Sequence, residues 1–512
     1  MDTTSLWQGT AAKSACLATL QTDLKVDVAI VGAGITGLTA AMLLVEAGKR
    51  VAVFDMHKVG AGATGNSTGN LYPTVDVNLQ AIAAASGPET AASVAASRRA
   101  AIDCIARTVE RHAIDCAFQR VDWHLIAADD AHAQLVVDEQ AAAAAAGLEA
   151  SLADGSPLPV PAVRTLRVGG AAQFQPLAYV RGLAQAIGSE DCLIFENTPV
   201  LRIDDDPCIV HTEHAKVHCG AVILATHTPP GIHLVQSSMA VVREYGVALP
   251  LHGAAPAPGV YWHIGAERHS IRSYSDRGRD YLVMVGAAHS LGKAVVNESQ
   301  YDMLERFARA HFDVGPVAYR WSAQRYRMPD KLPCIGRNID ARNTYIATGF
   351  SGDGLVYGTL AGMMLADEIL GKDNPWRELY RVGRIDKEAR PEGFEGESTG
   401  APECKPLQLD AAARVQLEGV GAGESRQLEV QGQPVAVYRN REGQLHVVSG
   451  KCTHMGCGLK WNGAETSWDC TCHGSRFSAE GKVLEGPALA PLPRLDTAAG
   501  DEADEEYGIG EV

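Results

Sequence analysis

The sequence predicts an α/β domain with a parallel sheet, an antiparallel sheet interleaved with it along the chain, and a small all-β domain near the C-terminus. Three observations carry this prediction. An apolar strand, a glycine-rich turn, a helix and a second apolar strand follow one another between residues 26 and 55. Alternating or continuous apolar segments at 241–249 and 281–285 fit antiparallel strands. Short alternating segments separated by turn residues begin after residue 407.

The first of these segments predicts a nucleotide-binding unit. Val26–Val31 is long enough for a buried parallel strand, and Arg50–Phe54 for a second one that ends at Asp55. In a Rossmann-like unit of this order, glycines let the backbone approach a pyrophosphate, and the helix N-terminus offers N–H groups. Asp55 is the predicted acceptor for the ribose hydroxyls of a dinucleotide. The predicted pyrophosphate contacts are Gly32, Gly34, Ile35, Thr36 and Gly37.

The loop after Asp55 indicates which dinucleotide binds. Residues 60–73 read G-A-G-A-T-G-N-S-T-G-N-L-Y-P. This text resembles the D-amino-acid-oxidase-like superfamily of FAD enzymes, which includes glycine and sarcosine oxidoreductases. The resemblance implies that the loop passes the flavin at Thr64, Gly65 and Asn66. Because Thr64–Asn70 contains neither His nor Cys, we expect FAD to be bound non-covalently.

Later segments resemble further parts of the same superfamily. Thr198-Pro199-Val200 matches a strand that clamps the adenine, and Arg327–Gly336 resembles the family motif "PDGLPxIG". A strand at Ala221–Ala225 and a glycine-rich turn that opens a helix to about Leu370 are expected to lie against FAD. The residues that the resemblance assigns to FAD in these segments are Val200, Ala225, Thr226, Gly349, Gly352, Gly354 and Leu355.

Between the glycine-rich loop and residue 225, the chain alternates helical and strand patterns. Ala-rich stretches predict helices at Glu89–Arg111 and Ala131–Ala146, with Gly147 as the stop of the second. Trp123–Ala128 is a predicted strand of a substrate-facing sheet, and Tyr179–Ile187 a predicted helix.

The antiparallel sheet supplies candidates for substrate binding. An arginine fork binds a carboxylate through two hydrogen bonds, so the candidates are Arg243, Arg272 and Arg325. The alternative for each is an ordinary ion pair. His227 follows the strand that ends against FAD, but a hydrogen-bonding role is its plainer interpretation. No catalytic residue is assigned.

Two short motifs near the C-terminus predict a metal centre. Cys452 and His454 form the first pair, and Cys470 and His473 the second. One tetrahedral zinc is an alternative, but the single residue between Cys452 and His454 is short for a zinc pair. Two loops that each bring one Cys and one His resemble the Rieske family, where these residues hold a [2Fe–2S] cluster.

The Rieske resemblance also assigns residues around the cluster. Cys457 and Cys472 match a disulfide of the high-potential, electron-carrying branch, with two free thiols as the alternative. Ser475 matches a serine that bonds a bridging sulfide. Phe477 stands where high-potential members carry Tyr, so we expect a lower potential. Gly486–Ala488 matches the Pro-containing loop that covers the cluster.

These patterns divide the chain into an FAD-dependent domain at 1–385, a charged, Pro/Gly-rich linker at 386–406, and a Rieske domain with an acidic tail at 407–512. Gly419–Gly423 is a predicted hairpin turn. The strands expected in the last domain are Arg414–Leu417, Gln427–Val430, Val435–Arg439 and Leu445–Val448.

Composition narrows the class of protein. The 512 residues carry a formal net charge of −16, which argues against a nucleic-acid surface. The sequence contains no apolar run of 18 residues, so no transmembrane helix is predicted. Residues 1–22 lack a signal-peptide pattern. Twelve cysteines, eight of them scattered, do not form a disulfide scaffold. The cytoplasm is the expected compartment.

The two resemblances together predict an FAD-dependent dehydrogenase that oxidises an amine or amino acid at a CH–NH or CH–NH₂ group. Electrons would leave through the Rieske cluster, one at a time, to an external acceptor of the ferredoxin or quinone type. The alternatives are an NAD(P)H-dependent flavin reductase, a non-catalytic redox sensor, and tRNA-base processing. The first needs a second nucleotide fold that the sequence does not show, and the net charge argues against the last.

Overall fold

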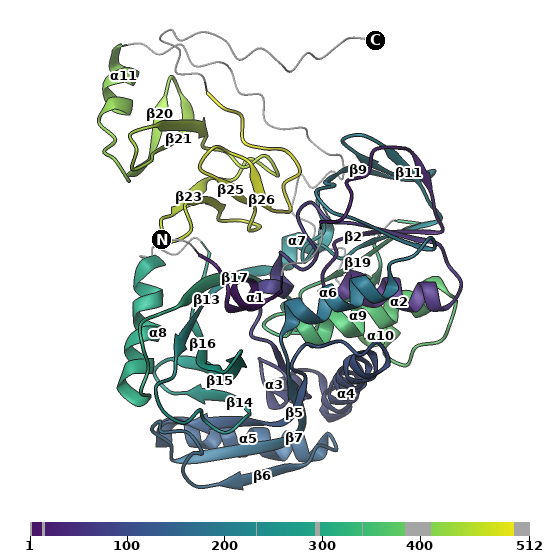
Figure 1. Cartoon of the computed structure of the whole chain (residues 1–512), viewed down its shortest axis with the longest axis vertical. Coiled ribbons are helices and arrows are strands. Elements are labelled where there is room, and N and C mark those ends of the chain that lie inside the picture. The colour runs from purple at the N-terminus through teal and green to yellow at the C-terminus, as the bar shows by residue number, and fades with distance from the viewer. Residues whose placement is uncertain are drawn as a thin grey trace. The chain divides into compact units, whose positions relative to one another are not determined.

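The structure, a computed structural model, describes residues 3–12, 16–231, 233–291, 297–339, 341–384 and 411–495. The chain divides into two compact units (Figure 1). The first is Met1–Glu397 with Gly463–Glu465, and the second is Ser398–Asn462 with Thr466–Val512. The predicted linker at 386–406 and the acidic tail lie outside the described residues.

A six-stranded sheet forms the nucleotide-binding part of the first unit. Its strands are parallel except for the edge strand β18, which runs antiparallel to β19. In sheet order they are β18 (Cys334–Arg337), β19 (Thr344–Thr348), β12 (Ala221–Leu224), β2 (Val28–Val31), β3 (Val51–Phe54) and β8 (Cys192–Phe195).

Both faces of this sheet are covered, since its strands are buried on both sides. Helices cover one face, and a small second sheet covers the other. Val28 and Ile30 belong to the core that also holds the helices, whereas Ala29 and Val31 pack with a small second sheet. The helices are α2 (Ile35–Glu46), α4 (Pro88–Arg111), α6 (Pro176–Ile187), α9 (Gly354–Ile369) and α10 (Arg377–Tyr380). The small sheet is β1 (Leu24–Lys25), β11 (Lys216–His218), β10 (Cys208–Thr212) and β9 (Val200–Asp205).

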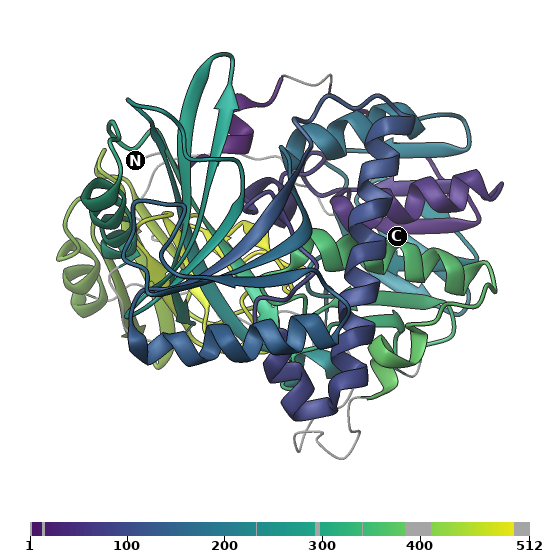
Figure 2. The same ribbon diagram turned by 90° about the horizontal axis from the view of Figure 1, so that it is seen from below.

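A nine-stranded sheet forms the rest of the first unit, and its strands alternate along the chain with those of the six-stranded sheet (Figures 1 and 2). In sheet order its strands are β17 (Tyr319–Arg327), β13 (Ala240–Pro250), β16 (Arg279–Ser290), β15 (Arg268–Asp276), β14 (Val260–Ile264), β5 (Gln119–Ala127), β7 (Arg164–Gln173) and β4 (Asn70–Leu71), with β6 (Ala150–Ala153) on β7. The remaining helices are α1 (Leu6–Thr10), η1 (Ala63–Asn66), α3 (Leu79–Ser86), α5 (Asp130–Ala145), α7 (Leu234–Ser238), α8 (Asn297–His311) and η2 (Val382–Arg384).

The second unit consists of two small antiparallel sheets. One is β20 (Ser425–Val430), β21 (Gln433–Arg439) and β22 (Leu445–Ser449), and the other is β23 (Leu459–Asn462), β24 (Ser467–Cys470), β25 (Arg476–Ser478) and β26 (Val483–Glu485). The predicted fold class, an α/β nucleotide-binding domain with an interleaved antiparallel sheet and an all-β C-terminal domain, is confirmed.

One element of the second unit was predicted wrongly. Residues 414–417 were expected to be a strand, but they lie in helix α11 (Ala411–Glu418). The three alanines that open this segment favour a helix, and alternation over four residues is too short to outweigh them. Gly419–Gly423 therefore connects a helix to β20 and is not the turn of a hairpin.

Candidate cofactor and substrate sites

The turn after β2 is built so closely that it requires glycine. Gly32 has a φ of +107°, and a Cβ added there would lie 2.4 Å from the carbonyl oxygen of Ala225. A Cβ on Gly37, in the first turn of α2, would lie 2.0 Å from the carbonyl oxygen of Gly32. Both distances are shorter than any tolerated contact. A side chain at either position would therefore displace the turn, which is why a turn of this kind needs glycine at both.

Two side chains fix the shape of this turn. Asp55 Oδ2 accepts a hydrogen bond of 2.9 Å from the Ala33 N–H, and its Oδ1 one of 2.8 Å from the His57 N–H. Thr64 Oγ1 accepts a 3.1 Å bond from the Ile35 N–H. Burial raises the pKa of Asp55, against these hydrogen bonds. Each carboxylate oxygen keeps a second lone pair, so Asp55 can still accept from a ribose hydroxyl.

The loop at residues 64–70 is held by side chains from distant segments. Ser5 Oγ donates to the Gly65 carbonyl at 2.5 Å, and Trp7 Nε1 to the Ser67 carbonyl at 2.6 Å. Trp321 Nε1, from β17, donates to the Asn66 carbonyl at 3.0 Å. No motif in the sequence predicts a role for α1, in which Trp7 is completely buried.

A second glycine turn follows β19 and opens α9. Gly349 has a φ of +78°, Gly352 is exposed between buried neighbours, and Leu355 is buried in the first turn of α9. The hydroxyl of Ser351 is buried and has no hydrogen-bond partner within the described ranges. Gly352 is exposed next to the unpaired hydroxyl of Ser351, and this combination suits a position beside a cofactor. A larger side chain at Gly352 would obstruct the ligand there.

The remaining predicted FAD contacts lie in the six-stranded sheet and in the small sheet that packs on it. Ala225 and Thr226 follow β12 and are half-buried, and Val200 is buried where β9 begins. The turns after β2 and β19 and the residues after β3 and β12 all follow carboxyl ends of parallel strands. Carboxyl ends of parallel strands share one edge of a sheet, which is where nucleotides bind. The donor set therefore fits FAD.

The three candidate arginines occupy different environments. Arg243 lies in β13 and donates to Ser322 Oγ at 2.8 Å and to Gln324 Oε1 at 3.0 Å. Arg272 is buried in β15, and its Nη1 donates to the Gly69 carbonyl at 2.7 Å, so that it supports the loop at 64–70. Arg325 lies four residues after Trp321 in β17, so the two side chains point to the same face of the strand. That face is the one towards the loop at 64–70, because Trp321 bonds to this loop.

Arg325 belongs to a buried cluster of charges that the sequence did not predict. Its Nη1 lies 2.9 Å from Asp76 Oδ2 and 3.7 Å from Glu244 Oε2. Arg268 Nη1 lies 3.0 Å from Asp76 Oδ1, an ion pair without the alignment of a hydrogen bond. Beside them, Arg98 pairs with Asp353 at 3.0 Å, and both side chains are fully buried.

The charges in this cluster shift one another's pKa values. Burial raises the pKa of Asp76, but the guanidiniums of Arg268 and Arg325 outweigh it and hold the pKa below its usual value. Burial raises the pKa of Glu244, and here Arg325 only partly offsets it. The one sequence signal for the cluster is the alternation Arg325-Tyr326-Arg327 on a strand. The partners come from four segments that only the fold brings together.

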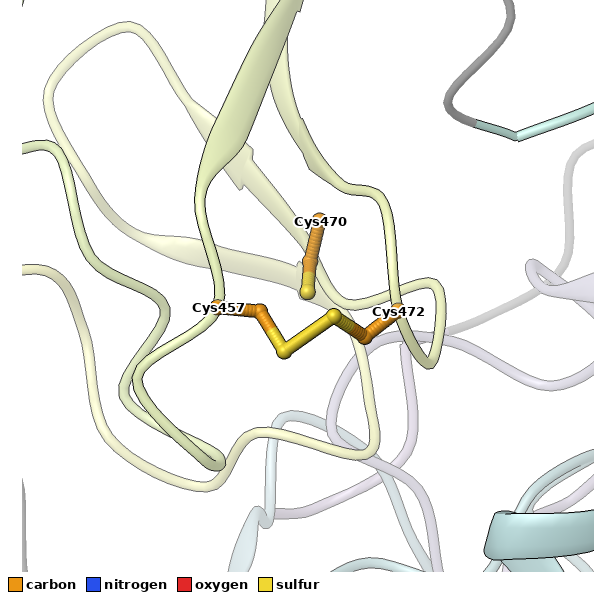
Figure 3. A group of neighbouring side chains, drawn as sticks. All are labelled: Cys457, Cys470 and Cys472. Carbon is orange, nitrogen blue, oxygen red and sulfur yellow. A yellow bond between two sulfur atoms is a disulfide. The ribbon is translucent and has the colours of Figure 1, made fainter.

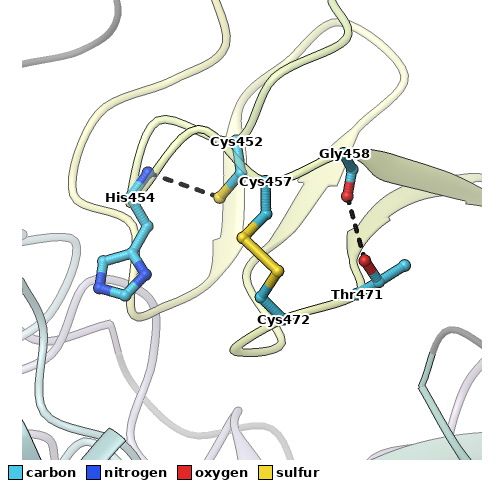
Figure 4. The surroundings of a disulfide bond; sticks show 6 residues. All are labelled: Cys452, His454, Cys457, Gly458, Thr471 and Cys472. Carbon is cyan, nitrogen blue, oxygen red and sulfur yellow. Dashed lines mark hydrogen bonds between the residues drawn. A yellow bond between two sulfur atoms is a disulfide. The ribbon is translucent and has the colours of Figure 1, made fainter. Parts of the chain in front are cut away.

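In the second unit, the four predicted cluster ligands lie on two neighbouring loops. Cys452 and Cys470 are buried, and the His454 and His473 ring centroids are 5.0 Å apart. The His454 N–H donates to Cys452 Sγ at 3.4 Å (Figure 4). Nδ1 of His473 is buried without a hydrogen-bond partner in the described part of the chain. Two thiols and two imidazoles, one with an unused nitrogen, fit the ligand set of a Rieske cluster.

The predicted disulfide between Cys457 and Cys472 is present and joins the two loops. The sulfur of Cys470 lies within 4.8 Å of both disulfide sulfurs, as Figure 3 shows. Among the described residues, this cysteine group is the one cluster of three or more metal-binding side chains with that spacing. The disulfide thus lies directly beside a predicted ligand.

Hydrogen bonds and buried side chains support the two cluster loops. Ser475 Oγ accepts a hydrogen bond of 3.0 Å from the Ala488 N–H, which ties the Pro-containing loop to the second ligand loop. Phe477 is completely buried. The thiol of Cys452 hydrogen-bonds to Cys470, which lowers the pKa of Cys470 and raises that of Cys452, so the pair shares one proton and one thiolate forms readily.

The fold and the two sites define an FAD-dependent oxidoreductase that carries a Rieske-type iron–sulfur domain. The model of the family "FAD dependent oxidoreductase" (DAO) matches residues 27–368, and the Rieske [2Fe-2S] domain model matches residues 411–496. The chain belongs to the FAD-dependent oxidoreductase (DAO) family. It therefore binds FAD and a [2Fe–2S] cluster, and the zinc alternative is excluded.

Similar proteins include a fusion of the same kind. The putative Rieske 2Fe-2S iron-sulfur protein YhfW of Bacillus subtilis is 30% identical over 484 residues, covering 93% of this chain and 94% of YhfW. The crystal structure of glycine oxidase from Geobacillus kaustophilus superposes with a TM-score of 0.58 at 20% identity, over 71% of this chain and all of that one. L-amino acid deaminase from Proteus myxofaciens gives 0.58 at 15% identity, over 73% and 98%. At these identities the two structures establish the fold of the first unit.

In the described ranges, no helix combines the length and apolar character that crossing a membrane requires.

Proposed function

We propose that this protein is a dehydrogenase that oxidises an amine or amino acid at a CH–NH or CH–NH₂ group and delivers the electrons to an external one-electron acceptor. The observation that carries the proposal is the presence, in one chain, of a flavin site and a complete set of Rieske ligands. When bound, FAD takes two electrons from a substrate and the [2Fe–2S] cluster carries one at a time. An acceptor of the ferredoxin or quinone type suits this outlet.

The residues that hold the cofactors in this proposal are those of the two glycine turns and the two cluster loops. The N–H groups of Gly34, Thr36 and Gly37 donate to the pyrophosphate, because those of Gly32, Ala33 and Ile35 donate to Phe54, Asp55 and Thr64. Asp55 accepts from the ribose. The partial positive charge at the N-terminus of α9 favours negative charge on the nearby cofactor edge. Cys452, Cys470, His454 and His473 are the cluster ligands. FAD is bound non-covalently, because Thr64–Asn70 offers neither His nor Cys.

Substrate binding is assigned to the face of the nine-stranded sheet that looks onto the loop at 64–70. Arg325 is the candidate on that face, whereas the hydrogen bonds of Arg243 and Arg272 engage them within the sheet and the loop. A guanidinium at this position would orient an amino acid by its carboxylate. Glu244 lies beside it, with a carboxyl whose pKa is raised by burial.

An anaerobic spectral screen tests this function. Amino acids and N-methyl amines are added singly to the purified holoprotein, with NADH and NADPH as the competing class of donor. We expect at least one amine or amino acid to bleach the flavin absorbance within seconds, and the nicotinamides to act far more slowly. Rapid bleaching by NADH alone would favour the flavin-reductase alternative and overturn the proposal. Bleaching by none of these donors would favour a redox sensor.

A separate measurement tests the mode of attachment. Acid denaturation should release the yellow chromophore into the supernatant. A yellow pellet would show a covalent bond and contradict the non-covalent assignment.

A further inference from the structure

The charge cluster around Asp76 has an excess of guanidinium when its buried carboxyls are protonated. Arg98 is matched by Asp353, and both are buried. The positive charges of Arg268, Arg325 and Arg327 act on Asp76 and Glu244, and that of Arg268 also acts on Glu139. Three guanidiniums thus face three carboxyls. Because burial raises the pKa of Glu139 and of Glu244, positive charge is in excess whenever either carboxyl is protonated.

These arginines also keep unused hydrogen-bond donors. The Nε atoms of Arg268, Arg325 and Arg327 are buried, and none has a hydrogen-bond partner within the described ranges. A guanidinium binds a carboxylate best as a fork, through Nε and one Nη. One carboxylate is satisfied by a single fork, so three unpaired Nε donors exceed what a substrate with one negative charge would use.

The cluster adjoins the predicted flavin edge. A Cβ added to Gly352 would lie 3.1 Å from Arg325 Nη1 and 3.1 Å from Asp76 Cγ. The side chain of Arg268 is 35% exposed and that of Arg325 12% exposed, whereas Asp76 is completely buried. Asp76 is therefore enclosed by the protein, whereas Arg268 and Arg325 keep exposed surface that a ligand can reach.

We propose that the substrate carries two anionic groups, as an amino dicarboxylate does, and that Arg268 and Arg327 bind the second group beside Arg325. The inference rests on the proposed function for the identity of the first group. Arg325 would bind the carboxylate next to the oxidised carbon. Arg268 and Arg327, which flank it from β15 and β17, would bind the distal acid. The ligand class is thus a small dicarboxylic amino acid or N-substituted amino acid.

Ligand binding without turnover tests this inference. The holoprotein is titrated with succinate and with succinamate, which differ by one negative charge at nearly constant size, and the flavin absorbance difference is recorded. We expect succinate to bind at least about tenfold more tightly. In Arg327→Gln and Arg268→Gln, the preference should fall to about twofold or less. Arg327→Lys, which keeps the charge without the fork, should retain an intermediate preference.

A matched control removes a guanidinium from the same strand. Arg320 lies in β17 but opposite Val247, and it contacts the ring of Tyr301. Arg320→Gln should leave the preference unchanged. An unaltered flavin spectrum in each variant shows that it has folded, and Arg268, the more exposed residue, provides a second variant should Arg327→Gln fail to fold.

The remaining outcomes overturn the inference. Equal binding of succinate and succinamate, or no spectral change with either ligand, would show that the cluster is only structural. A preference that persists in both glutamine variants would exclude these arginines. Failure of the proposed function is distinct, because it appears as the absence of amine-dependent bleaching while the titration stays readable.

Discussion

The charge cluster around Asp76 and the two loops that carry the predicted iron–sulfur ligands are both buried polar sites. Different interactions stabilise them. The first unites charges from the loop before α3 and from β13, β15 and β17, and the guanidiniums of Arg268 and Arg325 hold the pKa of Asp76 below its usual value. The second is joined by one disulfide across a sequence separation of 15 residues. The charge cluster is therefore sensitive to charge and to the whole fold, whereas the loops that carry Cys457 and Cys472 are joined locally and covalently.

Removing the central carboxylate should have the largest effect. Asp76→Asn leaves Arg268 and Arg325 without their shared counter-ion, and removing one partner of a buried ion pair costs about 3–5 kcal/mol. We expect this loss in the free energy of unfolding of the first unit, measured by flavin release in urea. Asp313→Asn, at an exposed carboxylate, should change it by less than about 0.5 kcal/mol. Equal stability of the two variants would show that the cluster does not hold the unit together.

Opening the disulfide should affect the second unit alone. For a loop of this length, the double variant Cys457→Ser/Cys472→Ser should destabilise that unit by about 3 kcal/mol. Cluster absorbance should then be lost at lower urea concentration, with flavin release unchanged. Cys16→Ser, at an exposed free cysteine, is the control. A parallel shift in flavin release would contradict the separation of the two regions.

The first unit should respond to pH at a buried carboxyl that fastens α3. Glu139 is fully buried and accepts hydrogen bonds from the Leu79 and Gln80 N–H groups. Burial raises its pKa to about 7, so the native state binds a proton that the unfolded state releases from about pH 4.5 upward. Stability from this group is therefore present at low pH and falls by about 2 kcal/mol between pH 5 and 7.

Glu139→Gln carries no titrating proton and should remove that part of the pH dependence. The measurement is flavin release in urea at each pH, for the variant and the unaltered protein. An identical pH profile for both would show that Glu139 does not titrate in this range. The disulfide does not titrate, so the stability of the second unit lacks this contribution.

The smallest expected effect concerns the reduction potential of the cluster. Phe477 is buried where high-potential Rieske domains carry Tyr. Phe477→Tyr would add one hydrogen-bond donor towards the cluster sulfur, worth about 1 kcal/mol, or about 40 mV for one electron. Redox titration followed by circular dichroism should show a positive shift of this size. If the potential does not rise, Phe477 is not a reason to expect a lower potential.

The difference between the two regions also explains which features of the molecule could be predicted from its sequence. The predicted cluster ligands Cys452, His454, Cys470 and His473 lie within two short motifs, and the glycine turn at 32–37 lies between its own strand and helix. Local spacing carries the chemistry in both, so the fold class and the cofactors could be predicted, and the resemblance to the Rieske family supplied the disulfide. The strand expected at 414–417 failed because four residues of alternation say little against a helix-forming composition.

The substrate side could not be predicted in the same way. Arg325 was named for its strand, but Asp76, Arg268 and Glu244 meet it only because β13, β15, β17 and the loop before α3 converge. Sequence spacing does not encode such a meeting. Arg272 was named for the same reason as Arg325, yet its donors are bonded to loop carbonyls, and Arg243 is bonded within the opposite face of its strand.

The central claim is that substrate electrons reach both redox centres inside one polypeptide. The most direct measurement is the rate of cluster reduction after rapid anaerobic mixing with the amine or amino acid that bleaches the flavin, followed by the electron paramagnetic resonance of the reduced cluster at several protein concentrations. We predict reduction of the cluster with a first-order rate constant that does not change on dilution. A bleached flavin beside a cluster that stays oxidised, or a rate proportional to protein concentration, would contradict the account.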